Sequence, residues 1–161
     1  MVKNSKNLLI KFIFLVSIIA LVSAFFIEYV LGHQPCNLCV LERIPYLLAI
    51  IVLLLNYKFI QFEKFFMLLL TIIFLTGTAL SLYHLGIEQG FIKESLVCDI
   101  KNGSNLLLKE EILMQLQEKN VSCKDVTFKI FGLSLTSYNI LISLLISIGA
   151  GKIYFNYDKN K

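Results

Sequence analysis

Long apolar runs separated by short polar segments dominate the chain. Four runs are long enough to cross a hydrocarbon core of about 30 Å, which takes about 20 residues of helix. They occupy residues 8–31, 44–60, 65–85 and 137–155. Sustained apolar runs of this length are typical of membrane-spanning helices. The pattern predicts an all-α membrane protein, a four-transmembrane-helix bundle that forms one domain over residues 1–161.

Composition agrees with this pattern. The chain is 57% hydrophobic and 16% charged, whereas soluble domains are roughly half apolar and a quarter charged. The segments outside the four runs are too short for a second independent core. We therefore expect membrane lipid around the chain and no nucleic acid as a partner.

The first apolar run has an alternative interpretation as a cleaved signal peptide. Lys3 and Lys6 precede it, and Val22, Ser23 and Ala24 resemble a cleavage site. The run is nevertheless longer than the usual apolar region of about 7 to 15 residues. We expect it to be retained as a membrane helix.

Basic residues predict the orientation, because lysine and arginine beside a span resist translocation. The segment at 32–43 carries only Arg43, and the segment at 86–136 has six lysines against seven acidic residues. These two loops are therefore expected outside, with both termini in the cytoplasm. The basic residues of the three expected cytoplasmic segments are Lys3, Lys6, Lys11, Lys58, Lys64, Lys152, Lys159 and Lys161.

All four cysteines fall on the two loops expected outside. Cys36 and Cys39 form a C-x-x-C in the first loop, and Cys98 and Cys123 lie in the second. Cysteines persist as disulfides in oxidising compartments. An orientation derived without the cysteines thus places each of them where disulfides are stable.

The C-x-x-C directly precedes the second apolar run. A thiolate beside the start of a helix is stabilised by unpaired backbone N–H groups, which favours redox exchange. Cys39 is the better candidate for that thiolate. The alternative is an inert disulfide between loop and helix, although so short a ring restrains little chain.

The second cysteine pair brackets a predicted helix over 106–119, capped by Ser104 or Asn105. That helix either lies on the membrane surface or is a plain solvated loop helix. Two pairs on one side indicate a relay, because thiol–disulfide exchange passes through a mixed disulfide that a neighbouring thiol resolves. A four-cysteine zinc site would repeat a close pair, which the second pair does not. No metal is expected.

Polar residues near the predicted membrane boundary complete the candidate site. Arg43 follows Cys39 by four residues, so it would share a helix face and stabilise both a thiolate and a developing negative oxygen. The alternative is a guanidinium that reaches to lipid headgroups. We expect His84, four residues before Glu88, to form a polar wall of an acceptor pocket, with an interface histidine as the alternative. Glu28 is expected at the interface or a helix contact.

These residues resemble a known family. Residues 35–43 read P-C-N-L-C-V-L-E-R, similar to the P-C-x-L-C-x-x-x-R loop of the DsbB family of disulfide bond formation proteins. Residues 83–88, Y-H-L-G-I-E, resemble a segment after the third helix of that family. Cys98, Cys123 and the F-G-L-S-L-T-S-Y-N run at 131–139 resemble its second cysteine loop and return to the membrane. The resemblance covers nearly the whole chain.

The resemblance implies a quinone-dependent thiol:disulfide oxidoreductase of the bacterial inner membrane. It would reoxidise a periplasmic thioredoxin-fold oxidase of the DsbA type and pass the electrons to ubiquinone or menaquinone. By the same resemblance Cys98 would form the mixed disulfide and Cys123 would be its pair. Cys36 would accept electrons from the second loop, and Cys39 would face the quinone beside Arg43.

The sequence leaves three alternatives. A specialised DsbB paralogue would serve one dedicated partner. An enzyme like vitamin K epoxide reductase also uses a membrane bundle and cysteine pairs, but its C-x-x-C is expected late in the bundle. A membrane assembly subunit with two structural disulfides would not need Arg43 beside the C-x-x-C.

Overall fold

The computed structural model describes residues 2–93, 122–124, 129–130 and 132–157. Its longer helices are α1 (Val2–Tyr29), α3 (Ile44–Lys58), α4 (Glu63–Glu88) and α6 (Leu135–Phe155). Short elements connect them: helix α2 (Asn37–Leu41), the 3₁₀ turn η1 (Ile60–Phe62) and strands β1 (Lys129–Ile130) and β2 (Leu133–Ser134). Cys98 and the helix predicted over 106–119 lie outside the described residues.

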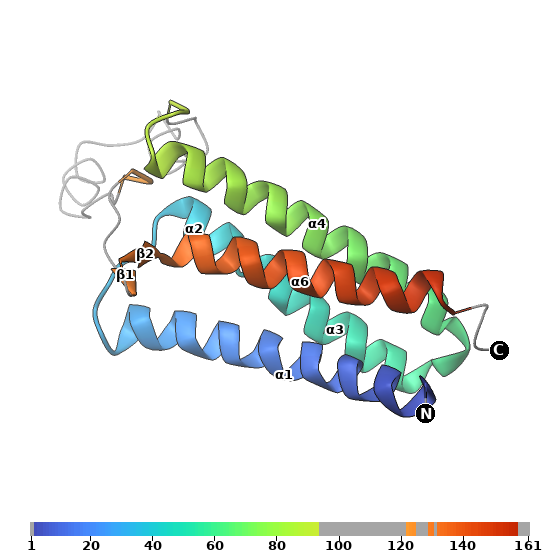
Figure 1. The fold of residues 1–161 in the computed structure, drawn as a ribbon. Coiled ribbons are helices and arrows are strands. Elements are labelled where there is room, and N and C mark those ends of the chain that lie inside the picture. The colour runs from blue at the N-terminus through green and yellow to red at the C-terminus, as the bar shows by residue number, and fades with distance from the viewer. Residues whose placement is uncertain (1, 94–121, 125–128, 131, 158–161) are drawn as a thin grey trace, which may run out of the picture.

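The four longer helices run alternately up and down as one bundle (Figure 1). The start of α1 and the end of α6 lie at one end of the bundle. The link from α1 to α2 and the strands lie at the other. Helices α4 and α6 make the most extensive contact, while α1 packs mainly on α3. The C-x-x-C therefore lies at the end of the bundle opposite the start of α1 and the end of α6.

Apolar side chains cover the outside of the bundle. Within the described residues, four helices are long and apolar enough to cross a membrane. Exposed leucine, isoleucine and phenylalanine side chains occur along every one of them. Contiguous apolar surfaces of this kind are rare on soluble monomers. The prediction of an all-α four-helix membrane bundle is confirmed, and the two-residue antiparallel strands β1 and β2 are a minor addition to it.

Two helix boundaries differ from the sequence prediction in ways that affect the site. A helical turn, α2, begins at Asn37, before the predicted start at residue 44, with Cys36 as its N-cap. Helix α4 continues past the predicted end at Leu85 and includes Glu88. Gly90, with a φ of +77°, then turns the chain away from the helix axis. The added turn of α4 carries Glu88, whose Oε1 lies 3.8 Å from His84 Nε2.

Two clusters of buried side chains fill the interior. The smaller one contains Cys36, Leu38, Ile87 and Cys123 at the cysteine end. The larger one fills the rest of the bundle and comprises Ile13, Tyr46, Ala49, Val52, Leu53, Phe66, Met67, Leu70, Phe74, Ile146, Ala150 and Ile153.

Gly77 sets the approach of α4 to α3. A Cβ atom at this position would lie 3.1 Å from Cγ of Pro45, and a proline ring has little freedom to move aside. Small residues at helix contacts allow backbones to approach closely in membrane proteins. Gly149 of α6 differs, because its Cβ would meet only the flexible Leu9 side chain, at 3.6 Å.

We expect Gly77→Ala to be less stable than Gly149→Ala. Both changes gain about 1 kcal/mol of helix propensity, but only Gly77→Ala overpacks a rigid contact, at a cost of about 1 to 3 kcal/mol. Thermal unfolding of the two variants in the same detergent measures the difference. Equal midpoints would show that the contact between Gly77 and Pro45 is not tight.

Candidate thiol redox site

The C-x-x-C forms the N-terminus of α2. Cys36 is the N-cap residue, and its sulfur accepts a hydrogen bond from the backbone N–H of Cys39 at 3.3 Å. The two sulfur atoms lie 2.7 Å apart, which is longer than the about 2.05 Å of a disulfide bond, and both cysteines are free thiols. The sequence favoured Cys39 as the residue beside the start of a helix. The backbone N–H instead points to Cys36, because helical structure begins before residue 44.

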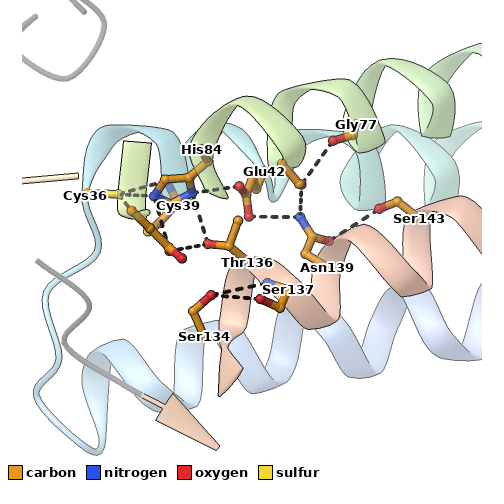
Figure 2. A network of polar contacts seen from close by, with 12 residues as sticks. Cys36, Cys39, Glu42, Gly77, His84, Ser134, Thr136, Ser137, Asn139 and Ser143 are labelled. Atoms are coloured by element: carbon orange, nitrogen blue, oxygen red, sulfur yellow. Dashed lines mark hydrogen bonds and ion pairs between the residues drawn. The ribbon is translucent and has the colours of Figure 1, made fainter. Parts of the chain in front are cut away.

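His84 connects the C-x-x-C to a carboxylate. Its Nε2 lies 3.5 Å from Cys36 Sγ, and its Nδ1 lies 2.8 Å from Oε1 of Glu42. A carboxylate only accepts, so Nδ1 carries a proton; in the neutral ring Nε2 then presents its lone pair to the Cys36 thiol. The imidazole is only 1% exposed. Figure 2 shows the resulting row of thiol, imidazole and carboxylate across the α2–α4 contact.

The environment of Cys36 favours the protonated thiol. Its hydrogen bond with Cys39 raises the pKa of Cys36 well above the ordinary value, and burial raises it further. The hydrogen bond with His84 acts in the opposite direction. Among the described residues, His84 is thus the neighbour that lowers the pKa of Cys36 and favours loss of its proton.

The row extends into α6 through Asn139. The amide nitrogen of Asn139 donates to Glu42 Oε2 at 2.9 Å and to Ser81 Oγ at 2.8 Å. Its carbonyl oxygen accepts from the hydroxyl of Tyr46. Both carboxylate oxygens of Glu42 therefore have partners. One polar network joins the α2–α3 junction to α4 and α6 (Figure 2).

Glu88 occupies the other side of His84. Its Oε1 accepts a hydrogen bond from the Thr136 hydroxyl at 2.6 Å and lies 3.8 Å from His84 Nε2. Its Oε2 is buried and has no hydrogen-bond partner among the described residues. Buried polar atoms without a partner are uncommon in folded proteins. An acceptor is thus available beside the histidine.

Arg43 forms an ion pair across the bundle. Its guanidinium nitrogen donates to Oε2 of Glu28 in α1 at 2.5 Å, and the guanidinium lies 5.2 Å from the centre of the Phe25 ring. Glu28 is accordingly a helix-contact residue, one of the two roles expected for it. The pair ties α1 to the α2–α3 junction. In this arrangement the charge of Arg43 is balanced by a carboxylate.

A cavity of about 350 Å³ lies beside these groups, within the range of about 300 to 1,000 Å³ for small-molecule sites. Apolar residues of α1, among them Val16, Ile19 and Ala20, line one side of it. Polar and sulfur-bearing residues at the cysteine end line another: Cys36, Cys39, Glu42, Arg43, His84, Glu88, Cys123 and Asn139. An apolar chamber with convergent polar groups at one end suits a small amphipathic ligand.

The structure gathers most of the predicted site residues around this cavity. Cys36, Cys39, Arg43, His84 and Cys123 all line it. Cys123 is buried in the same cluster as Cys36. Of the predicted catalytic and quinone-binding residues, only Cys98 lies outside the described part of the chain.

Sequence reasoning did not single out Glu42, Asn139, Thr136 and Tyr46 as members of the network. One signal was present for Asn139, because amide groups inside apolar runs are costly and tend to face a bundle interior. A second was the spacing of polar residues along the last helix, which places four of them on one face: Thr136, Asn139, Ser143 and Ser147.

The fold and the site define a class: a membrane four-helix bundle with a redox-capable dithiol beside a cavity at one end. The family model of the disulfide bond formation protein DsbB matches residues 6–152. The chain is also 35% identical over 148 residues to a protein named "Uncharacterized protein RP370" from Rickettsia prowazekii (strain Madrid E). That match covers 91% of this chain and 86% of the relative. No solved structure matches the chain.

The chain belongs to the DsbB family of disulfide bond formation proteins. It is therefore a multi-pass membrane thiol oxidoreductase of disulfide bond formation. The relative carries no functional description in its name, so it adds similarity without adding a substrate or a partner.

We expect Asn139→Ala to destabilise the bundle more than Ser143→Ala does. Removing the Asn139 amide leaves Glu42 Oε2 buried without its donor, at a cost of about 1 to 3 kcal/mol. Ser143 lies one turn further along the same helix and makes only longer contacts, of 3.3 and 3.4 Å. Unfolding in detergent gives the comparison. Similar losses for both variants would mean that Glu42 does not depend on Asn139.

Proposed function

We propose that this protein reoxidises a periplasmic thioredoxin-fold oxidase of the DsbA type and passes the electrons to a membrane quinone. The observation that carries this proposal is the placement of Cys36 and Cys39 on the wall of an apolar cavity that also presents Arg43 and His84. Membership of the DsbB family supports the disulfide chemistry. The quinone, the partner and the inner-membrane location are inferred from the same resemblance.

The volume and lining of the cavity are compatible with a quinone. A quinone needs an apolar environment for its ring and donors for its two oxygens, and the cavity offers α1 side chains for the ring. Arg43 and the Cys39 thiol line the cavity and offer donors for those oxygens. When bound, ubiquinone or menaquinone supplies a two-electron acceptor that is soluble in the membrane.

Oxidation of the Cys36–Cys39 dithiol forms one sulfur–sulfur bond and releases two electrons and two protons. His84 Nε2 faces Cys36 Sγ, so His84 is placed to accept the proton of that thiol. Glu42 holds the ring through Nδ1 and stabilises the imidazolium. This arrangement follows the general rule that a base beside a nucleophile is itself oriented by a third group. Glu42 acts as a positioning residue for His84.

Electrons would enter from the second cysteine pair. Cys123 is buried in the cluster that contains Cys36, which supports exchange between the two pairs. By resemblance Cys98 forms the mixed disulfide with the soluble partner and Cys123 resolves it. The distribution of basic residues supports a periplasmic position for all four cysteines.

Arg43 supplies the positive charge at the acceptor site. Its pairing with Glu28 fixes the guanidinium at the cavity wall and balances its charge in the resting protein. A partial negative charge that develops on the acceptor is then stabilised by a donor that is already in place. Glu28 is a positioning residue, because it contacts Arg43 and, among the described residues, no cysteine sulfur.

A thiol oxidation assay on the purified full-length protein tests the function. With a reduced DsbA-type protein as substrate, we expect thiol loss that requires added quinone. Cys36→Ser and Cys39→Ser should each abolish it, because the acceptor pair is then incomplete. Oxidation that proceeds equally without quinone, or that survives Cys39→Ser, would contradict the proposal.

The contribution of Arg43 is separable from that of the cysteines. We expect Arg43→Ala to lower quinone-dependent turnover roughly tenfold to several-hundredfold, as for loss of one or two charge-assisted hydrogen bonds. Arg43→Lys should be intermediate, since it keeps the charge but loses the planar fork. Exchange between the two cysteine pairs should change much less. Quinone titration of turnover, beside single-turnover thiol exchange, measures both.

A matched control exists for the ion pair itself. Lys6 and Glu63 form a pair of 2.8 Å at the opposite end of the bundle. Glu28→Gln should alter the dependence of turnover on quinone concentration, whereas Glu63→Gln should not. If both variants behave alike, or if Arg43→Ala leaves quinone kinetics unchanged, the Arg43–Glu28 pair serves only to hold helices together.

A further inference from the structure

We propose that the reduced site binds one divalent cation of the zinc class through Cys36, Cys39 and His84, with Glu88 as fourth ligand. This site is inferred from the positions of the donor atoms, and it requires neither the quinone nor the soluble partner. It is also distinct from the four-cysteine site that the spacing of the sequence argued against, because it uses a single cysteine pair.

The three donors already surround one point. The sulfur atoms of Cys36 and Cys39 and a ring nitrogen of His84 all lie within 4.8 Å of one another. Zinc lies about 2.3 Å from sulfur and about 2.0 to 2.1 Å from nitrogen, so ligand atoms around one ion lie roughly 3.5 to 4 Å apart. The 3.5 Å between Cys36 Sγ and His84 Nε2 has that value before any movement. The two sulfurs, at 2.7 Å, need to separate for both to bind one ion.

Glu88 lies next to this three-donor cluster and is the candidate for the fourth ligand, an oxygen. Its side chain is 6% exposed, and its Oε1 lies 3.8 Å from His84 Nε2. Its Oε2 is buried without a hydrogen-bond partner among the described residues. This is an observation independent of the three other donors. A cation beside His84 would satisfy this buried oxygen.

His84 is oriented as zinc-binding histidines are. Metal-bound histidines usually donate their other ring N–H to a carboxylate, which fixes the tautomer and strengthens the ligand. Glu42 fills that role at 2.8 Å from Nδ1, and Thr136 Oγ1 lies 3.2 Å from the same nitrogen. Nε2 is thereby left to face the sulfurs. The outer contacts of a metal site are therefore present.

Binding would be restricted to the dithiol state. Two thiols and one Zn²⁺ give a zinc dithiolate and two released protons, with no change of oxidation state. The two thiolates offset the charge of the ion in this buried position. A disulfide leaves no thiolate to bind, because both sulfurs are bonded to each other. Cation binding and disulfide formation thus exclude each other at Cys36 and Cys39.

Co²⁺ is the probe, because its bonds to thiolate give absorption bands that Zn²⁺ does not. The protein to be tested is the full-length chain with the substitutions Cys98→Ser and Cys123→Ser, so that only the C-x-x-C supplies thiolate. After reduction and anaerobic removal of the reductant, we expect about one Co²⁺ per chain with thiolate bands, displaced by Zn²⁺. The same protein with an oxidised C-x-x-C should bind none. Equal Co²⁺ binding in both states would overturn the proposal.

Ligand variants assign the residues. His84→Gln should abolish tight Co²⁺ binding, whereas His33→Gln, which changes the only other histidine of the chain, should leave it intact. Glu42→Gln should weaken affinity about 10- to 100-fold, as for loss of an outer carboxylate. Glu88→Gln should weaken it as well, and an unchanged affinity would overturn the assignment of Glu88. Thiolate bands that survive His84→Gln would overturn the site.

The readout separates this inference from the proposed function. Co²⁺ and Zn²⁺ binding are measured without quinone and without a soluble partner, so a negative oxidase assay leaves them untouched. Conversely, absence of cation binding leaves quinone-dependent thiol oxidation in place. Monodisperse elution and helical circular dichroism of each variant exclude misfolding as the cause of lost binding.

Discussion

The hydrogen bonds of Glu42 are the interaction on which the cysteine end of this bundle depends. A carboxylate buried at the edge of a membrane is costly unless its oxygens are satisfied. One carboxylate oxygen of Glu42 accepts a hydrogen bond from His84 of α4, and the other accepts one from Asn139 of α6. Because Glu42 follows the C-x-x-C by three residues, these two bonds fix the cysteines against two other helices. The tautomer of His84 and the direction of its Nε2 follow from them.

Helix α1 is held differently, and this difference creates the cavity. It packs mainly on α3 and contacts α6 far less than α4 does. At the cysteine end, the Arg43–Glu28 pair and the contact of Arg43 with the Phe25 ring join it to the bundle. Apolar α1 side chains therefore face the polar network across an open space instead of interdigitating with it. The dithiol borders a space that an apolar molecule can occupy.

The same donor set supports both the proposed redox chemistry and the inferred cation site. A histidine that faces a thiol with a lone pair accepts a proton in one case and binds a metal in the other. What separates the two outcomes is the state of Cys36 and Cys39, since a disulfide removes both sulfur ligands. Glu88 contributes to the cation site through an oxygen that the proposed thiol oxidation does not use.

The sequence alone determined the membrane class, the four apolar helices and the cysteine pattern that resembles the DsbB family, because hydrocarbon thickness sets helix length and C-x-x-C chemistry needs few residues. It also singled out Arg43 and His84 from their spacing and position. It did not identify the hydrogen bond between Glu42 and Asn139, because these two residues are 97 positions apart in the chain and only helix packing brings them together. The pairing of Arg43 with Glu28 and the extra turn that carries Glu88 were likewise decided by tertiary structure. A buried polar side chain takes its partner from whichever helix packs against it, and one sequence does not specify that neighbour.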